Sequence, residues 1–168
     1  MKKTALGMVL VLGLSVGLTT QSSAATVKLT SAQQAQIKYL VEEEKLARDV
    51  YTYLLGTSGS QKFRNIAQAE QTHMNLVSGV LKTYGVVDPS LGEKAGVFQN
   101  TALAALYKKL TASGRVDYVG ALAAGVAIEK LDIADLKTDI KTETASDVLW
   151  MLNTLLQGSE KHLVAFTR

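Results

Sequence analysis

Acidic and imidazole side chains lie on the apolar side of four predicted helices. The only two histidines, His73 and His162, each lie in an amphipathic helical pattern, in phase with its apolar residues. Two other segments carry Glu44 and Glu129 in the same way. Burying such groups costs free energy unless a partner satisfies them. The pattern therefore predicts helices that bring these side chains together, and a pair of metal ions is the ligand that suits them best.

The chain as a whole predicts an all-α fold in one domain. It has a single proline in 168 residues and little of the apolar–polar alternation that is typical of strands. With 47% hydrophobic and 20% charged residues, its composition is that of a globular chain rather than a disordered one.

Residues 1–25 predict a cleaved signal peptide. Lys2 and Lys3 form a basic start, residues 7–18 are apolar, and residues 22–25 offer the small side chains of a cleavage site. The apolar run is short for a membrane span, although a retained anchor is the alternative. We therefore expect residues 26–168 to form the folded domain of a periplasmic or secreted protein.

The charge and cysteine content exclude several classes of partner and site. Lys2 and Lys3 account for two of the three excess positive charges, so residues 26–168 carry a net charge of +1. This segment also shows no basic cluster with interleaved aromatic residues, which argues against a nucleic-acid partner. The absence of cysteine excludes disulfides, thiolate metal sites and thiol chemistry.

Apolar residues recur at helical spacing in four long segments, at about residues 31–55, 61–84, 117–137 and 144–166. Thr30 is the expected N-cap of the first segment, and residues 144–147 resemble a capping box at the start of the last. A short helix at about residues 101–112 is expected within the long link between the second and third segments. Two short connections around one long crossover predict a four-helix bundle.

The second segment contains the string Glu70-x-x-His73. Side chains three residues apart lie on one face of a helix, about one turn from each other. Both can then reach one ion, or Glu70 can bridge two. The string occurs by chance on helix surfaces, but here it is in phase with Ile66, Val77 and Val80. That phase favours a metal-binding interpretation.

The first segment contains the acidic run Glu42-Glu43-Glu44, which on its own is typical of a solvated helix face. Only Glu44 has apolar residues at helical spacing on both sides, among them Leu40 and Tyr51. We therefore expect Glu44 to face the core, and Glu42 and Glu43 to face solvent.

The last two long segments complete the set. Glu129 is in phase with its apolar neighbours, and Asp132 follows one turn later, either as a direct ligand or as a helix cap or a partner of a ligand. His162 follows Ser159 at the same three-residue spacing. Glu160 lies on another face and is expected to be exposed.

The predicted metal ligands are therefore Glu44, Glu70, His73, Glu129, Asp132 and His162. Four carboxylates and two neutral imidazoles balance the charge of two divalent ions. Oxygen-rich ligation with one imidazole per ion favours iron first and manganese second over copper, and zinc can bind in vitro.

At these residues the chain resembles the ferritin-like superfamily, and most closely an uncharacterised bacterial and archaeal family within it. The matching segments are residues 42–51, 69–74, 96–100, 128–136 and 158–166. The resemblance implies a ferritin-like four-helix bundle with a carboxylate-bridged di-metal centre. Ser159 departs from the superfamily pattern, which has a second Glu-x-x-His on the last helix. Rubrerythrin-like members carry an extra acid at the position that matches Asp132, which could supply the missing carboxylate.

The resemblance implies a functional class as well. The leading hypothesis is an exported di-iron or di-manganese oxidoreductase that reacts with dioxygen or peroxide. In it Glu70 and Glu129 bridge the ions, Glu44 and Asp132 are terminal ligands, and His73 and His162 bind one ion each. Tyr51 is then either a core tyrosine or a phenol that takes part at the centre.

Two other classes remain open. One is metal sequestration or delivery without catalysis. The other is a metal-free helical interaction module, in which the six side chains would not converge. A homodimer is compatible with each class.

Overall fold

The computed structural model describes residues 28–168, and this part of the chain is all-α, with five helices and no strand. The predicted signal peptide lies outside the described residues. The helices are α1 (Ser31–Ser58), α2 (Gln61–Thr83), α3 (Thr101–Gly114), α4 (Tyr118–Ile140) and α5 (Ser146–Thr167). The four long segments and the short crossover helix of the sequence prediction are thus all present.

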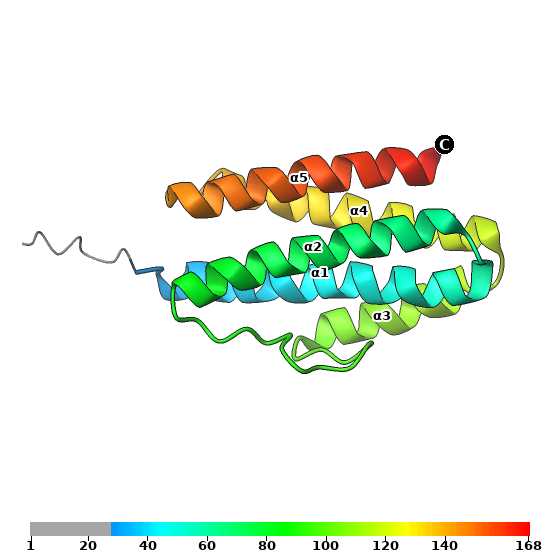
Figure 1. Ribbon diagram of the computed structural model, residues 1–168, viewed down its shortest axis with the longest axis horizontal. Helices are drawn as coiled ribbons and strands as arrows, with labels where there is room; N and C mark the ends of the chain where they lie inside the picture. The colour runs from blue at the N-terminus through cyan, green and yellow to red at the C-terminus, as the bar shows by residue number, and fades with distance from the viewer. Residues whose placement is uncertain (1–27) are drawn as a thin grey trace, which may run out of the picture.

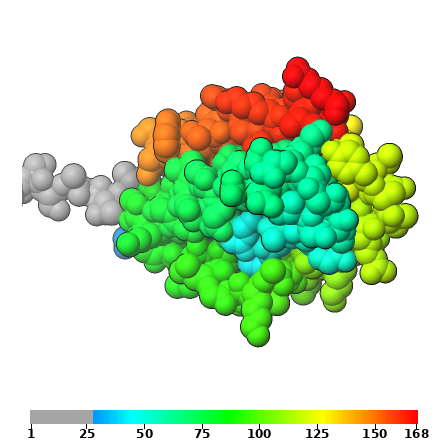
Figure 2. Space-filling view, turned by 45° about the vertical axis from the view of Figure 1, so that its right-hand side comes forward, coloured from blue at the N-terminus to red at the C-terminus, as the bar shows by residue number. Residues whose placement is uncertain are grey.

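The four long helices run side by side along the length of the molecule (Figure 1). α1 packs mainly against α2, and α4 mainly against α5, while α3 lies against α1 and α4. Figure 2 shows one broad face, on which α2 and α5 lie in front with residues of the crossover below them. None of the helices between residues 28 and 168 is long and apolar enough to cross a membrane.

The helix ends follow local capping in some places and tertiary contacts in others. Thr30 caps α1 in a capping box with Gln33, as the sequence predicts. α1 continues three residues beyond the expected end and is capped by Gly59, whose φ of 67° suits glycine. The capping box predicted at residues 144–147 is wrong. α5 begins at Ser146 without a side-chain cap. The Glu143 carboxylate instead accepts hydrogen bonds from the amides of Thr144 and Ala145, directly before the helix.

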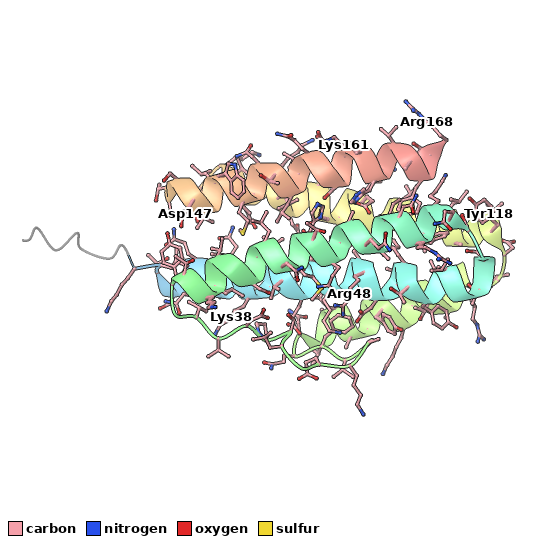
Figure 3. The ribbon with its side chains drawn as sticks, in the orientation of Figure 1. Lys38, Arg48, Tyr118, Asp147, Lys161 and Arg168 are labelled. Atoms are coloured by element: carbon pink, nitrogen blue, oxygen red, sulfur yellow. The ribbon has the colours of Figure 1, made fainter. Side chains whose placement is uncertain are left out.

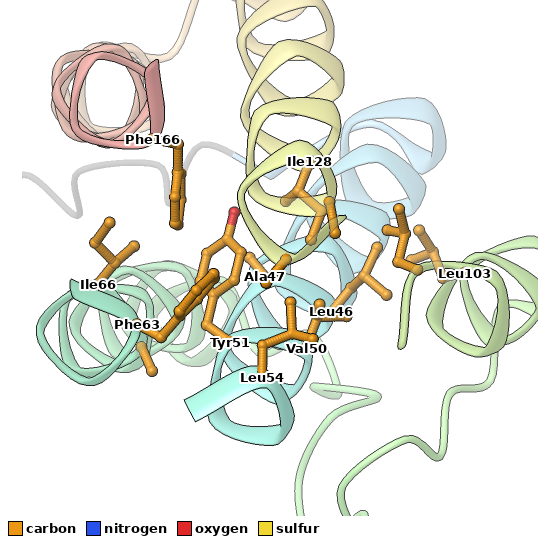
Figure 4. Close-up of a cluster of buried hydrophobic side chains, with 14 residues drawn as sticks. Leu46, Ala47, Val50, Tyr51, Leu54, Phe63, Ile66, Leu103, Ile128 and Phe166 are labelled. Carbon is orange, nitrogen blue, oxygen red and sulfur yellow. The ribbon is translucent and has the colours of Figure 1, made fainter. Parts of the chain in front are cut away.

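The apolar core consists of two clusters at different levels of the molecule. One contains Tyr51, Phe63 and Phe166, whose rings pack against one another (Figure 4). The other contains Leu40, Leu81 and ten further buried residues. On each long helix, the predicted ligands fall in sequence between the residues of the two clusters. The fold therefore places the polar groups in a layer with apolar packing on either side.

The buried surface of α4 includes small residues beside its larger apolar ones. Leu122, Val126 and Ile133 are only half-buried, whereas Ala121, Ala124 and five further residues of the helix are buried. The reason is that α4 contacts three helices, so its buried surface is wider than one stripe and includes small residues.

The prediction that Glu42 and Glu43 face solvent is also wrong, since both are buried. The crossover covers this side of α1. The Glu42 carboxylate accepts hydrogen bonds from the amides of Gln99 and Asn100, directly before α3. Glu42 therefore fastens the crossover to α1.

A second anchor of the crossover lies one turn further along α1. The side chain of Lys45 is fully buried and donates to Asp49 at 2.6 Å and to the carbonyl of Lys94 at 2.8 Å. Its ammonium group lies 4.5 Å from the centre of the Phe98 ring. Asp49 in turn accepts a hydrogen bond from the Gly96 amide. Much of the charged run on α1 thus has a structural role.

Replacing Lys45 with alanine is expected to lower the free energy of unfolding by about 3 kcal/mol, because it removes one partner of a buried ion pair. Urea unfolding followed by circular dichroism measures the change. Lys161→Ala is the control, since Lys161 projects from the outer side of α5 (Figure 3). Its effect is expected to stay within about 0.5 kcal/mol. Equal stability of Lys45→Ala and the wild type would contradict the anchoring role.

Candidate metal centre

Glu70 occupies the middle of the polar layer. Its side chain is 1% exposed and lies on the inner face of α2, one turn from His73. Glu70 Oε2 is 2.8 Å from His73 Nδ1, and Glu70 Oε1 is 2.8 Å from His162 Nδ1 on α5. One carboxylate therefore faces two imidazoles through separate oxygens. The centres of the two imidazole rings are 5.5 Å apart.

Glu44 and Glu129 close the layer from the sides of α1 and α4. Glu44 Oε2 lies 3.2 Å from His73 Nδ1, and Glu129 Oε1 lies 3.7 Å from His162 Nδ1. Both carboxylates are buried. Each histidine thus has Glu70 on one side and a second glutamate on another.

Asp132 and Ser159 lie beside this group. Asp132 is buried on α4, one turn from Glu129, and Ser159 is buried on α5. Burial raises the pKa of Asp132 to about 7. The Ser159 hydroxyl donates to the Leu155 carbonyl of its own helix at 3.0 Å. Glu160 is exposed as expected and pairs with Lys137.

Several polar atoms of the layer lack the hydrogen bonds that burial normally requires. They are Oε1 of Glu44, both oxygens of Glu70, Oδ1 of Asp132 and Nδ1 of His162. The short approaches between Glu70 and the histidines do not have hydrogen-bond alignment. Unsatisfied buried groups of this kind call for a ligand. Three potential ligand atoms, from Glu70, His73 and His162, lie within 4.8 Å of one another. This spacing is short enough for all three to bind one cation. The donor set therefore fits metal ions.

Without metal ions, bound protons reduce the negative charge of the buried carboxylates in this layer. Burial alone would lower the pKa of His73, but Glu44 and Glu70 raise it to about 10. Burial would raise the pKa of Glu70, but the two histidines lower it to about 2. Burial and neighbouring acids raise the pKa values of Glu44 and Glu129. Cations entering the layer must therefore displace protons.

Three functional features escaped the sequence analysis in whole or in part. The Tyr51 hydroxyl donates to Glu129 Oε1 at 2.6 Å, so Tyr51 is both a core residue and a partner of the site. Its phenol oxygen points toward α4 in Figure 4. Gly158 on α5 lies directly against the His73 ring, which a β-carbon at this position would overlap. Glu43 is buried beside Glu44. For Tyr51 the sequence did offer a signal, because a spacing of seven residues places it on the same helix face as Glu44.

Fold and site together define an all-α protein with a buried layer of carboxylates and histidines contributed by four helices. The chain belongs to the family described as "Uncharacterized protein domain (DUF2202)", which matches residues 33–168. It is 45% identical over 127 residues to the uncharacterized protein MJ0754 of Methanocaldococcus jannaschii, covering 76% of this chain and 69% of that protein. The crystal structure of hypothetical protein MJ0754 superposes with a TM-score of 0.81 at 40% identity, covering 83% of this chain and 80% of the other.

Proposed function

We propose that this protein is a ferritin-like four-helix-bundle protein with a di-metal carboxylate centre, and that it is an oxidoreductase that reacts with dioxygen or peroxide. Iron is the preferred metal and manganese the second choice. The observation that carries the proposal is the position of Glu70, whose two oxygens each lie 2.8 Å from a different histidine. A carboxylate placed in this way is suited to bridge two ions.

In this proposal each ion has one imidazole ligand. His73 and His162 bind one ion each, Glu70 and Glu129 bridge, and Glu44 and Asp132 are terminal ligands. The four carboxylates and two neutral imidazoles then balance two divalent charges, which removes the cost of burying the acids. Bound iron or manganese would supply the electrons for reduction of the oxidant.

The residues around the ligands hold and shape the site. Tyr51 donates to Glu129 and so fixes the orientation of that carboxylate. The apolar clusters on either side of the layer limit the access of water. Ser159 stands where the superfamily pattern has a glutamate, and its smaller side chain leaves one fewer carboxylate on α5. This asymmetry favours the side of His162 for access of a small oxidant.

The same proposal includes the place of the protein in the cell. The pattern of residues 1–25 supports export to the periplasm or the exterior. It also supports a mature domain that starts near residue 26. Partners are then metal ions and a small oxidant.

Metal loading of the wild type and a Glu70→Ala variant tests the proposal. We expect the wild type, titrated with Fe²⁺ without oxygen, to bind two ions per chain and then to consume peroxide. Glu70→Ala is expected to bind neither ion tightly, because both ions lose their shared ligand. Elemental analysis after gel filtration gives the stoichiometry.

Glu160→Ala is the control, since this exposed acid lies two residues before His162 but outside the layer. It is expected to bind two ions. Two ions in Glu70→Ala, with unchanged peroxide consumption, would overturn the proposal. Tight binding by the wild type without turnover would support metal sequestration instead. The hypothesis of a metal-free interaction module is less favoured, because it predicts that the two histidines lie apart, whereas their ring centres are 5.5 Å from each other.

A further inference from the structure

The end of the bundle opposite the start of α1 combines exposed apolar side chains with a concentration of positive charge. At this end α1, α3 and α5 finish, and α2 and α4 begin (Figure 1). The hydroxyls of Ser60 and Tyr118 are 3.4 Å apart, which joins the turn before α2 to the start of α4. Lys62 Nζ donates to the carbonyl of Arg168 at 3.3 Å, which joins α2 to the end of α5. Figure 3 shows Tyr118 and Arg168 on this surface, which we call the basic end.

Two valines at the turn between α3 and α4 are exposed on the basic end. Val116 is 76% exposed and Val119 is 74% exposed. The residue before a helix N-cap commonly packs against the fourth residue of the helix. Val116 directly precedes Asp117, the N-cap of α4, yet it remains in solvent. Packing within the chain therefore does not explain the apolar character of this position.

The turn that carries the valines is closely packed. The Asp117 carboxylate accepts a hydrogen bond from the Gly120 amide at 2.6 Å. A β-carbon on Gly120 would lie 2.8 Å from the carbonyl oxygen of Ser113, so the backbones of α3 and α4 approach closely here. The valines are thus held outward by an ordered backbone. This order reduces the conformational entropy that is lost when a partner buries them.

Positive charge surrounds the valines. The segments that form the basic end, residues 52–69, 101–128 and 162–168, contain six lysines and arginines but one acid, Asp117. The cations are Lys62, Arg64, Lys108, Lys109, Arg115 and Arg168, and all except Lys62 are exposed. The rest of residues 26–168 contains ten cations and fourteen acids. The net charge of +1 therefore conceals an uneven distribution, in which the basic end is strongly positive.

We propose that the basic end docks on the surface of an anionic lipid bilayer. Val116 and Val119 enter the headgroup region, and the surrounding cations contact lipid phosphates. A bilayer matches both features, because it presents anionic headgroups above an apolar layer. A nucleic acid would match the charge but not the exposed valines. Docking of this kind needs no membrane-spanning helix, and it does not depend on the metal centre.

Sedimentation with lipid vesicles tests this surface. The protein without residues 1–25 is used, because all five helices lie within residues 28–168 and the predicted signal peptide could itself bind lipid. We expect it to bind vesicles made of equal parts of phosphatidylglycerol and phosphatidylcholine. Binding to vesicles of phosphatidylcholine alone is expected to be weaker by about tenfold or more, and high salt is expected to release the protein.

Replacing both valines of the basic end with serine tests the apolar contact. Val116→Ser/Val119→Ser is expected to weaken binding to the anionic vesicles by about tenfold, because less apolar surface leaves water. The matched control is Val87→Ser/Leu91→Ser, since these crossover residues near the end of α2 are 78% and 74% exposed. The control is expected to bind like the wild type. Circular dichroism verifies the fold of each variant.

Replacing two cations tests the electrostatic contact. Lys109→Gln/Arg115→Gln is expected to weaken binding by about 25-fold, since each basic residue near an anionic membrane contributes about fivefold. Chelator-treated and metal-loaded protein are expected to bind vesicles equally, so failure of the di-metal proposal would leave this one intact. Absence of binding to anionic vesicles, or binding that the valine substitutions do not change, would overturn the proposal. Stronger binding to duplex DNA than to anionic vesicles would also overturn it, and would assign the basic end to a nucleic acid.

Discussion

Replacing Gly158 with alanine is expected to weaken metal binding by roughly 10–100-fold, because the added β-carbon occupies the place of the His73 ring. At this position the β-carbon would overlap Nε2 and Cε1 of His73 and lie 3.8 Å from its Cδ2. The His73 ring must therefore rotate or shift, and its Nδ1 then leaves its position near Glu44 and Glu70. Titration with Fe²⁺ in the absence of oxygen measures the loss of affinity.

The expected loss of metal affinity does not come from a weaker helix. Alanine in place of a helical glycine normally stabilises a helix by about 1 kcal/mol. Gly79→Ala is the matched control, since Gly79 is an exposed helical glycine of α2 and a β-carbon added there would meet no atom within 4 Å. It is expected to raise stability slightly and to leave metal binding unchanged. Wild-type affinity in Gly158→Ala would show that the contact does not position His73.

The sequence predicts which polar side chains meet in the buried layer, because the signal is local. Glu70 and His73 are separated by one helical turn, and apolar residues on both sides give them the phase of the core. The same holds for Glu44, Glu129 and His162, which the structure brings to one layer. A polar side chain in phase with a helical apolar stripe is expensive to bury, so its position is informative even without a structure.

The errors concern contacts between residues far apart in sequence. The acidic run of α1 looks like a solvated face, since nothing nearby indicates that the crossover covers it. Glu42 accepts hydrogen bonds from the amides of residues 99 and 100, and Lys45 donates one to the carbonyl of Lys94. The start of α5 is likewise decided by Glu143, which also accepts a hydrogen bond from Gln33 on α1. Local patterns cannot predict such partners.

Close packing at the site was equally hidden. Gly158 resembles an ordinary helical glycine, and its role depends on a histidine of another helix. Tyr51 and Glu129 show the same limitation, because their positions in the sequence do not indicate that the hydroxyl donates to that carboxylate. The polar residues of the layer could thus be predicted from the sequence, but the residues that pack against them could not.

The metal-free protein is expected to lose stability as the pH rises from about 5 to 8. Buried Glu43 has a pKa of about 10 instead of 4.5, so the folded state keeps a proton that the unfolded state releases. Its contribution to stability is present at low pH and falls by about 1.4 kcal/mol per pH unit above 4.5. Asp132, with a pKa of about 7, and His73, with a pKa of about 10, act in the same direction over parts of this range.

Glu70 acts in the opposite direction at lower pH. Its pKa of about 2 lies below the ordinary value of 4.5, so its contribution is present above pH 4.5 and is lost as the pH falls toward 2. The stability of the metal-free protein should therefore pass through a maximum at about pH 4, where the gain from Glu70 and the losses from Asp132 and Glu43 cancel. Urea unfolding of chelator-treated protein at successive pH values measures this curve. A stability that stays constant or rises between pH 5 and 8 would contradict the assignment of these buried protons.

Two comparisons separate the protons from other effects of pH. Glu43→Gln is expected to remove about 1.4 kcal/mol per pH unit from the slope between pH 5 and 8, because the amide does not titrate. In the protein saturated with Mn²⁺ the cations replace the protons, and metal affinity rises with pH as competition from protons falls. The difference in stability between loaded and metal-free protein should therefore increase from pH 5 to 8. A difference that shrinks over this range would mean that the ions bind outside the layer of buried acids and histidines.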